Sequence, residues 1–174
     1  MVKTIILGGG CFWCLEAIFQ KIKGVLKVEP GYAGGNLPDP TYNQVCSGET
    51  GHAEAVRLEY NPDKIDLENI LDVFFSIHDP TTLNKQDMDV GTQYQSIILW
   101  TEPQQKNIVQ EYLSKITKNY KDPIITQLEK LKKFYPAEDY HFDYYNRNKL
   151  QPYCQFVILP KIGKTEKDFS GFIK

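Results

Sequence analysis

The chain is organised around the stretch Gly8-Gly9-Gly10-Cys11-Phe12-Trp13-Cys14. The apolar residues 2–7 before it predict a buried strand, and after it apolar side chains recur at helical spacing as far as Gly24. Cys11 therefore lies between a glycine turn and the first turn of a helix. Free backbone N–H groups and the positive end of the helix dipole favour a thiolate there, so Cys11 is a candidate nucleophile.

The same stretch has competing interpretations. A nucleotide-binding turn is excluded, because Trp13 stands where G-x-G-x-x-G needs its last glycine and no Gly-Lys-Ser/Thr follows. Cys11 and Cys14 form the C-x-x-C pattern of thioredoxin-like redox proteins, or half of a zinc site, although Cys46 and Cys154 stand alone. Both cysteines could instead be structural, since cysteine is among the most buried residue types. The local pattern supports redox or nucleophilic chemistry and a structural role about equally.

Composition narrows the class of protein. A chain of 174 residues predicts a single domain, residues 1–174, with a substantial core. The net charge of −2 and the scattered lysines and arginines argue against nucleic acid or an anionic membrane as a partner. No apolar run is long enough to span a membrane and no signal peptide is evident, so we expect a cytoplasmic protein. We also expect a monomer with no metal and no cofactor.

Strands and helices alternate irregularly along the rest of the chain. Strands are expected at residues 25–28, 52–60, 93–101 and 124–128. Helices are expected after an Asp66 N-cap, after a Thr101–Gln104 capping box, and irregularly over 136–146, while 30–48 and 81–92 are expected to be loops. This order predicts an α+β (mixed α/β) two-layer sandwich with a central mixed sheet and a long, poorly regular C-terminal tail.

One acidic residue stands out in the alternating segment 52–60. Glu54 shares a face with Val56 and Leu58, so this pattern carries its carboxyl inward at the edge of the sheet. Burial would raise the pKa of that carboxyl toward neutrality, as a general acid requires. The alternative is that Glu54 lies at a fraying strand end and points into water.

Several separate segments together resemble one known family, the peptide methionine sulfoxide reductases of the A type. Gly10-Cys11-Phe12-Trp13 is similar to the catalytic motif of that family. The resemblance continues, in the family's order and over most of the chain, through residues 31–35, 40–42, 50–54, 79–86, 91–96 and 137–141.

The resemblance implies a reaction. Cys11 would attack the sulfoxide sulfur, with a pKa below the free value of ~8.5 at least when substrate is bound. Glu54 would protonate the leaving oxygen, which places its carboxyl inward. Tyr42 and Tyr94 would donate hydrogen bonds to that oxygen. The products would be methionine and a sulfenic acid on Cys11.

The resemblance also implies a binding site and a second thiol. Phe12 and Trp13 would hold the methyl group of the substrate, and Asp89 would line the same site through water or the backbone. Cys154, on a mobile tail, is favoured as the thiol that resolves the sulfenic acid, with Cys14 as the alternative. Thioredoxin would then reduce the disulfide. A thioredoxin-like disulfide oxidoreductase and a zinc-binding module remain the other classes of function to test.

Overall fold

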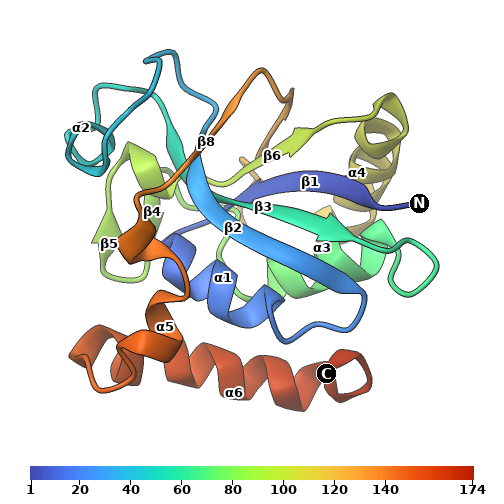
Figure 1. Cartoon of the computed structure of the whole chain (residues 1–174). Coiled ribbons are helices and arrows are strands. Elements are labelled where there is room, and N and C mark those ends of the chain that lie inside the picture. The colour runs from blue at the N-terminus through green and yellow to red at the C-terminus, as the bar shows by residue number, and fades with distance from the viewer.

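The computed structural model describes all residues 1–174 and is built around a six-stranded mixed sheet (Figure 1). In sheet order the strands are β7 (Gln127–Lys130), β6 (Ile97–Trp100), β1 (Lys3–Gly8), β3 (Ala53–Tyr60), β2 (Val25–Ala33) and β8 (Phe134–Pro136). All neighbours are antiparallel except β6 and β7, which are parallel. The expected mixed α/β fold with a mixed sheet is confirmed.

Helices cover one face of this sheet and carry most of the core. The helices are α1 (Phe12–Phe19), α2 (Tyr42–Cys46), α3 (Leu67–Ser76), α4 (Pro103–Ile116), α5 (Tyr144–Arg147) and α6 (Leu159–Asp168). The larger apolar cluster joins α1 and α3 to the sheet, and a smaller cluster, which includes Ile6 and Leu99, lies on the other face. Figure 1 shows α6 running beneath α1, on the side away from the strands. None of the helices is both long and apolar enough to cross a membrane.

Of the two helix N-caps predicted from the sequence, the structure has one. Asp66 caps α3 as predicted, because its side chain accepts the N–H of Asn69 at 2.8 Å. The expected box at Thr101 is wrong: the capping box of α4 is formed by Glu102 and Gln105. The Thr101 hydroxyl is used elsewhere, donating to a carbonyl oxygen of β1 at 2.7 Å.

The structure corrects four expected boundaries, one of them through a partner that lies far away in the sequence. Strand β2 continues through Gly31–Ala33, which were expected in a loop, because β3 pairs with it along its whole length. Tyr42–Cys46, also expected in a loop, forms α2 behind a capping box at Thr41. Residues 92–94 form a 3₁₀ turn, so the strand expected from 93 begins at Ile97. A short hairpin of β4 (Lys85–Gln86) and β5 (Asp89–Val90) interrupts the loop at 81–92.

The C-terminal segment is regular and docked, which corrects the prediction of a poorly regular tail. A π-helical turn over Cys154–Ile158 continues directly into α6. Cys154, Ile158 and Ile162 recur at a spacing of four and are buried in the main core cluster. Pro160 does not interrupt this segment: it is the second residue of α6, directly after the π-helical turn, and the helix continues through it.

Candidate active site

Cys11 occupies the junction that the sequence predicts. It is the N-cap of α1 in an extended conformation, and its carbonyl oxygen accepts the N–H groups of Cys14 and Leu15 at 3.1 and 3.5 Å. Gly10 before it has a φ of +94°, a conformation that glycine adopts without strain. The side chain of Cys11 lies inside the molecule, with 8% of its surface exposed.

Burial reverses the expected acidity of this thiol in the free protein. Burial raises the pKa of Cys11 well above that of a free thiol, and interactions with Cys14 and the charge of Glu54 raise it further. The backbone N–H of Trp13 lowers the pKa of Cys11, but by less. In the unliganded protein the loss of solvent therefore outweighs the helix terminus, and a lowered pKa of Cys11 with substrate bound stays a prediction.

Cys14, one helical turn later, has the opposite tendency. Interaction with the Cys11 thiol lowers the pKa of Cys14, and the positive charge of Lys161 and the Tyr153 hydroxyl lower it too, although burial opposes them. The Tyr153 hydroxyl lies 3.9 Å from Cys14 Sγ. Of the two neighbouring thiols, Cys14 is thus the one whose surroundings favour the thiolate.

Glu54 points inward from the start of β3, as the alternating pattern indicates. Its side chain is 1% exposed, and its Oε1 accepts the backbone N–H of Phe12 at 3.2 Å. Burial, and then the nearby charges of Asp89 and Cys14, raise the pKa of Glu54 to about 8, so the carboxyl is mostly protonated at neutral pH. Its Oε2 is buried without a hydrogen-bond partner. A protonated carboxyl with one free oxygen is therefore held next to the residue that follows Cys11.

Two tyrosine hydroxyls lie around the Glu54 carboxyl. Burial, and then the charge of Glu54, raise the pKa of Tyr42 and of Tyr94 well above the usual range, so both remain protonated donors. Glu138 fixes the position of Tyr42, because its Oε2 accepts the Tyr42 backbone N–H at 2.9 Å and its Oε1 accepts the Tyr32 hydroxyl at 2.8 Å. Tyr42 comes from α2 and Tyr94 from the 3₁₀ turn, so only the tertiary structure unites them.

Aromatic rings form the wall beside Cys11. Trp13 stacks on Tyr144 with ring centres 3.7 Å apart and an interplanar angle of 5°. Its indole N–H donates to His141 Nδ1 at 3.0 Å. Phe12 is fully buried and packs against the rings of His141 and Tyr32, with centres 4.9 and 5.8 Å away. His141 is fully buried among these rings, and it also orients Trp13.

Asp89 reaches the site from strand β5. Its carboxylate accepts a hydrogen bond from the Tyr153 hydroxyl at 2.5 Å. Its negative charge raises the pKa of Glu54 and of Tyr94. Asp89 thus faces the predicted site, through a tyrosine side chain that the sequence analysis does not name. The same hydrogen bond ties the segment before Cys154 to the β4–β5 hairpin.

The chain matches the family model described as peptide methionine sulfoxide reductase over residues 3–171. It belongs to the peptide methionine sulfoxide reductase family. Two similar relatives are named peptide methionine sulfoxide reductase MsrA. The relative from Trichodesmium erythraeum is 50% identical over 171 residues, which cover 97% of each chain. The relative from Saccharolobus solfataricus is 49% identical over 173 residues, which cover 99% of this chain and 98% of the relative. This chain is therefore an enzyme of that family, and the thioredoxin-like alternative is not favoured.

Solved structures of the family share the fold. Methionine sulfoxide reductase A of Corynebacterium diphtheriae superposes with a TM-score of 0.84 at 33% identity, covering 89% of this chain and 78% of that one. The reduced form of Mxr1 from Saccharomyces cerevisiae gives a TM-score of 0.81 at 34% identity, covering 88% and 90%. Its unusual oxidized form gives only 0.64 at 32% identity, covering 84% and 82%. The present structure is closer to the reduced form, and all four of its cysteines are free.

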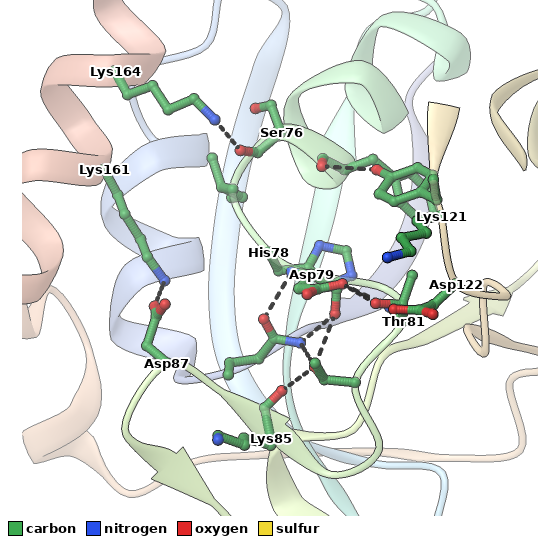
Figure 2. A pocket seen from close by; sticks show the side chains of 15 residues that line it. Ser76, His78, Asp79, Thr81, Lys85, Asp87, Lys121, Asp122, Lys161 and Lys164 are labelled. Carbon is green, nitrogen blue, oxygen red and sulfur yellow. Dashed lines mark hydrogen bonds and ion pairs between the residues drawn. The ribbon is translucent and has the colours of Figure 1, made fainter. Parts of the chain in front are cut away.

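The glycine turn before Cys11 is closely packed by His78 and Phe74. His78 also lines a cleft of about 620 Å³ to which α3, α6 and the β4–β5 hairpin contribute residues (Figure 2). The His78 ring packs so closely on Gly9 that a β-carbon there would lie 2.9 Å away. Burial lowers the pKa of His78 to about 4, and the neutral ring bonds Phe74 O at 2.6 Å and Ser96 Oγ at 2.8 Å. The cleft therefore holds supporting residues rather than the reacting groups.

The other two cysteines, Cys46 and Cys154, lie in different elements of the fold. Cys154 is fully buried in the π-helical turn. Burial raises the pKa of its thiol most, and a negative charge on Cys14 raises it further. Cys46 is exposed on α2. The chain has no group of three or more His, Cys, Asp or Glu side chains placed to hold a metal ion. A four-ligand zinc site is thus not assembled.

Sequence reasoning missed several residues that shape the site. Tyr153, Glu138, Tyr144 and Lys161 contact or orient groups that the sequence had assigned. The aromatic-rich segment 138–145 was a visible signal. Its function could not be read, because the residues that it contacts belong to α1 and α2.

Proposed function

We propose that this protein reduces the S epimer of methionine sulfoxide, free or in proteins, with Cys11 as nucleophile and Glu54 as acid. The observation that carries the proposal is the unpartnered, protonated Glu54 carboxyl beside the Cys11 junction. Sulfoxide oxygen is a poor leaving group unless it is protonated, and a buried acid with a pKa of about 8 can supply that proton at neutral pH. Membership of the family supports the same reaction.

The proposed step balances as a two-electron transfer. The Cys11 sulfur attacks the sulfoxide sulfur while Glu54 gives its proton to the oxygen. This attack forms an S–S bond between Cys11 and the substrate, whose oxygen becomes a hydroxyl group. The hydroxyl then passes to the Cys11 sulfur: the S–O bond of the substrate and the S–S bond break, an S–O bond to Cys11 forms, and the substrate leaves as methionine with the electron pair of the S–S bond, so that Cys11 is left as a sulfenic acid. The proton of the Cys11 thiol returns to Glu54, so the acid is restored. Tyr42 and Tyr94 donate hydrogen bonds to the oxygen as its negative charge develops.

The substrate side chain would lie against the aromatic wall. We assign the methyl group to Phe12 and Trp13: Phe12 is fully buried, Trp13 is partly buried, and both pack among other aromatic rings. Asp89 orders this site through Tyr153. The roles of these residues rest on their position around Cys11.

We assign the first disulfide to Cys11 and Cys14. The two thiols already interact, and the charge of Lys161 and the Tyr153 hydroxyl favour the Cys14 thiolate that would attack the sulfenic acid. Cys154, favoured by the sequence analysis because of its mobile tail, is fully buried in a docked segment. A reaction of Cys154 with Cys11 would require that segment to move, whereas a reaction of Cys154 with the neighbouring Cys14 would require a smaller movement.

Thioredoxin is the proposed reductant, and the enzyme would act as a monomer of one domain in a reducing compartment such as the cytoplasm. The related Mxr1 from Saccharomyces cerevisiae has been solved in complex with Trx2, with 24% identity and a TM-score of 0.58 to this chain. The four free cysteines fit a compartment in which thiols stay reduced.

Single-turnover chemistry tests these assignments. The reduced protein, without any reductant, is mixed with a peptide that contains methionine sulfoxide, and both methionine formed and thiols lost are counted. The wild type should form one methionine and lose two thiols. Cys11→Ser should form none, while the exposed matched control Cys46→Ser should behave as wild type. Methionine formation by Cys11→Ser would remove Cys11 from its role.

The same assay separates the two candidate resolving thiols. Cys14→Ser should still release one methionine but keep a sulfenic acid on Cys11, detected by a dimedone adduct. Cys154→Ser should lose two thiols at the wild-type rate, and peptide mapping should then find Cys11 joined to Cys14. A wild-type map with only a Cys11–Cys154 link, together with rapid disulfide formation in Cys14→Ser, would reverse the assignment.

A further inference from the structure

Glu16 is a buried acidic residue that the proposed chemistry does not use. It lies on α1 three residues after Trp13, so the two side chains share one face of the helix. Only 2% of Glu16 is exposed, and its Oε1 accepts the backbone N–H of Asp143 at 2.8 Å. A carboxyl is rarely buried to this extent unless it has a structural or chemical task.

The contact holds the start of α5, which lacks a cap of its own. Asp143 precedes α5 in a left-handed conformation with a φ of 52°, and its side chain makes no capping hydrogen bond. A backbone N–H at the start of a helix needs an acceptor. Glu16 supplies that acceptor from α1. The backbone N–H of Tyr144 also interacts with the Glu16 carboxyl and lowers its pKa.

The residue held next to this contact is the one that stacks on Trp13. Tyr144 lies flat on the indole, with ring centres 3.7 Å apart, while the indole N–H is fixed on another side by His141 at 3.0 Å. Glu16 and Trp13 therefore bind two consecutive residues of the same α5 segment. Loss of either contact frees the other.

We propose that Glu16 is a positioning residue for substrate binding, which anchors Asp143 and Tyr144 to α1 and so fixes Trp13 in the wall that receives the methyl group. This inference rests on the proposed function. Because Glu16 acts through Tyr144 and Trp13 and not on the reacting sulfur, its loss should raise KM much more than it lowers kcat.

The carboxyl can also make this anchor depend on pH. Burial raises the pKa of Glu16 to about 7; the Asp143 carboxylate raises it as well, and the Arg147 guanidinium lowers it. A carboxylate is a stronger acceptor for the Asp143 N–H than the neutral acid is. The anchor should therefore weaken, and KM should rise, as the pH falls below 7.

The test compares Glu16→Ala, Glu16→Gln, Tyr144→Ala and the double variant Glu16→Ala/Tyr144→Ala in steady-state sulfoxide reduction. Glu16→Ala should raise KM about tenfold, the factor expected from one lost hydrogen bond. Tyr144→Ala should do the same, and the double variant should add little to either, because both break one chain of contacts. Tyr145→Phe is the matched control: Tyr145 follows Tyr144 in α5 but does not stack on Trp13, so this variant should bind substrate as the wild type does.

Glu16→Gln keeps an acceptor oxygen but cannot ionise. It should rescue KM to within about twofold of wild type at pH 8 and remove the rise of KM below pH 7. Fluorescence of Trp13 in a Trp100→Phe background gives a readout without turnover, and its emission should shift in Glu16→Ala but not in Glu16→Gln. Additive effects of Glu16→Ala and Tyr144→Ala, or an unchanged KM in a folded Glu16→Ala, would overturn the proposal. A wild type that reduces no sulfoxide would instead reject the proposed function.

Discussion

Replacing Glu54 with glutamine should slow catalysis and remove the pH dependence that this carboxyl gives to the stability of the protein. The carboxyl is 1% exposed, and burial raises its pKa from the usual value of 4.5 to about 8. Glutamine has a similar shape and can still accept the Phe12 N–H, but it has no acidic proton. Loss of a general acid costs about 10²–10⁴-fold in rate, so we expect a loss in this range in the first turnover.

The pKa shift also fixes the sign of the stability effect. A group whose folded pKa is raised contributes stability that is fully present below its unfolded pKa of 4.5 and is lost as the pH rises through the folded value of about 8. At about 1.4 kcal/mol per unit, this loss approaches about 5 kcal/mol in the wild type. Glu54→Gln does not lose it, but carries a pH-independent cost of about 1–3 kcal/mol for a buried unpaired amide.

The variant should therefore be less stable than the wild type at pH 4.5 and more stable at pH 9. Urea unfolding of both proteins in reducing buffer at pH 4.5, 7 and 9 measures the difference in the free energy of unfolding. Glu54→Asp, which still ionises, is the control and should follow the pH trend of the wild type. A difference between Glu54→Gln and wild type that stays constant across this range, or full activity of Glu54→Gln, would refute the reasoning.

Three further changes test other contacts. Tyr42→Phe/Tyr94→Phe removes both donors to the sulfoxide oxygen, and kcat should fall at least about 10²-fold, with unchanged circular dichroism as the check on folding. Gly31→Ala would place a β-carbon 2.3 Å from a phenylalanine ring of β8, so it should lower the free energy of unfolding by about 3 kcal/mol in urea titrations; an unchanged midpoint would contradict this packing. Lys161→Met removes the cation that lowers the pKa of Cys14, so thiol loss after the first methionine should slow at neutral pH in stopped-flow assays, and a wild-type rate would exclude this role.

Local signals in the chain determined the framework of the site. The strand, glycine turn and helix around Cys11, and the capped helix after Asp66, were predictable because their hydrogen bonds and apolar periodicities join residues close in sequence. The alternation in β3 left the direction of Glu54 open between the interior and water, and the family resemblance favoured the interior. The resemblance of separate segments was by itself enough to indicate the family.

Other features were decided only by the tertiary structure, because they depend on burial and on partners distant in sequence. The high pKa of Cys11 follows from its enclosure, which no local pattern records. The length of β2 is set by β3, and the docking of Cys154 is set by the core against α1. The tie between Tyr153 and Asp89 spans 64 positions. Spacing in a sequence specifies local hydrogen bonds and faces, whereas solvent exclusion and the electrostatics that follow from it exist only once the chain has closed around the site.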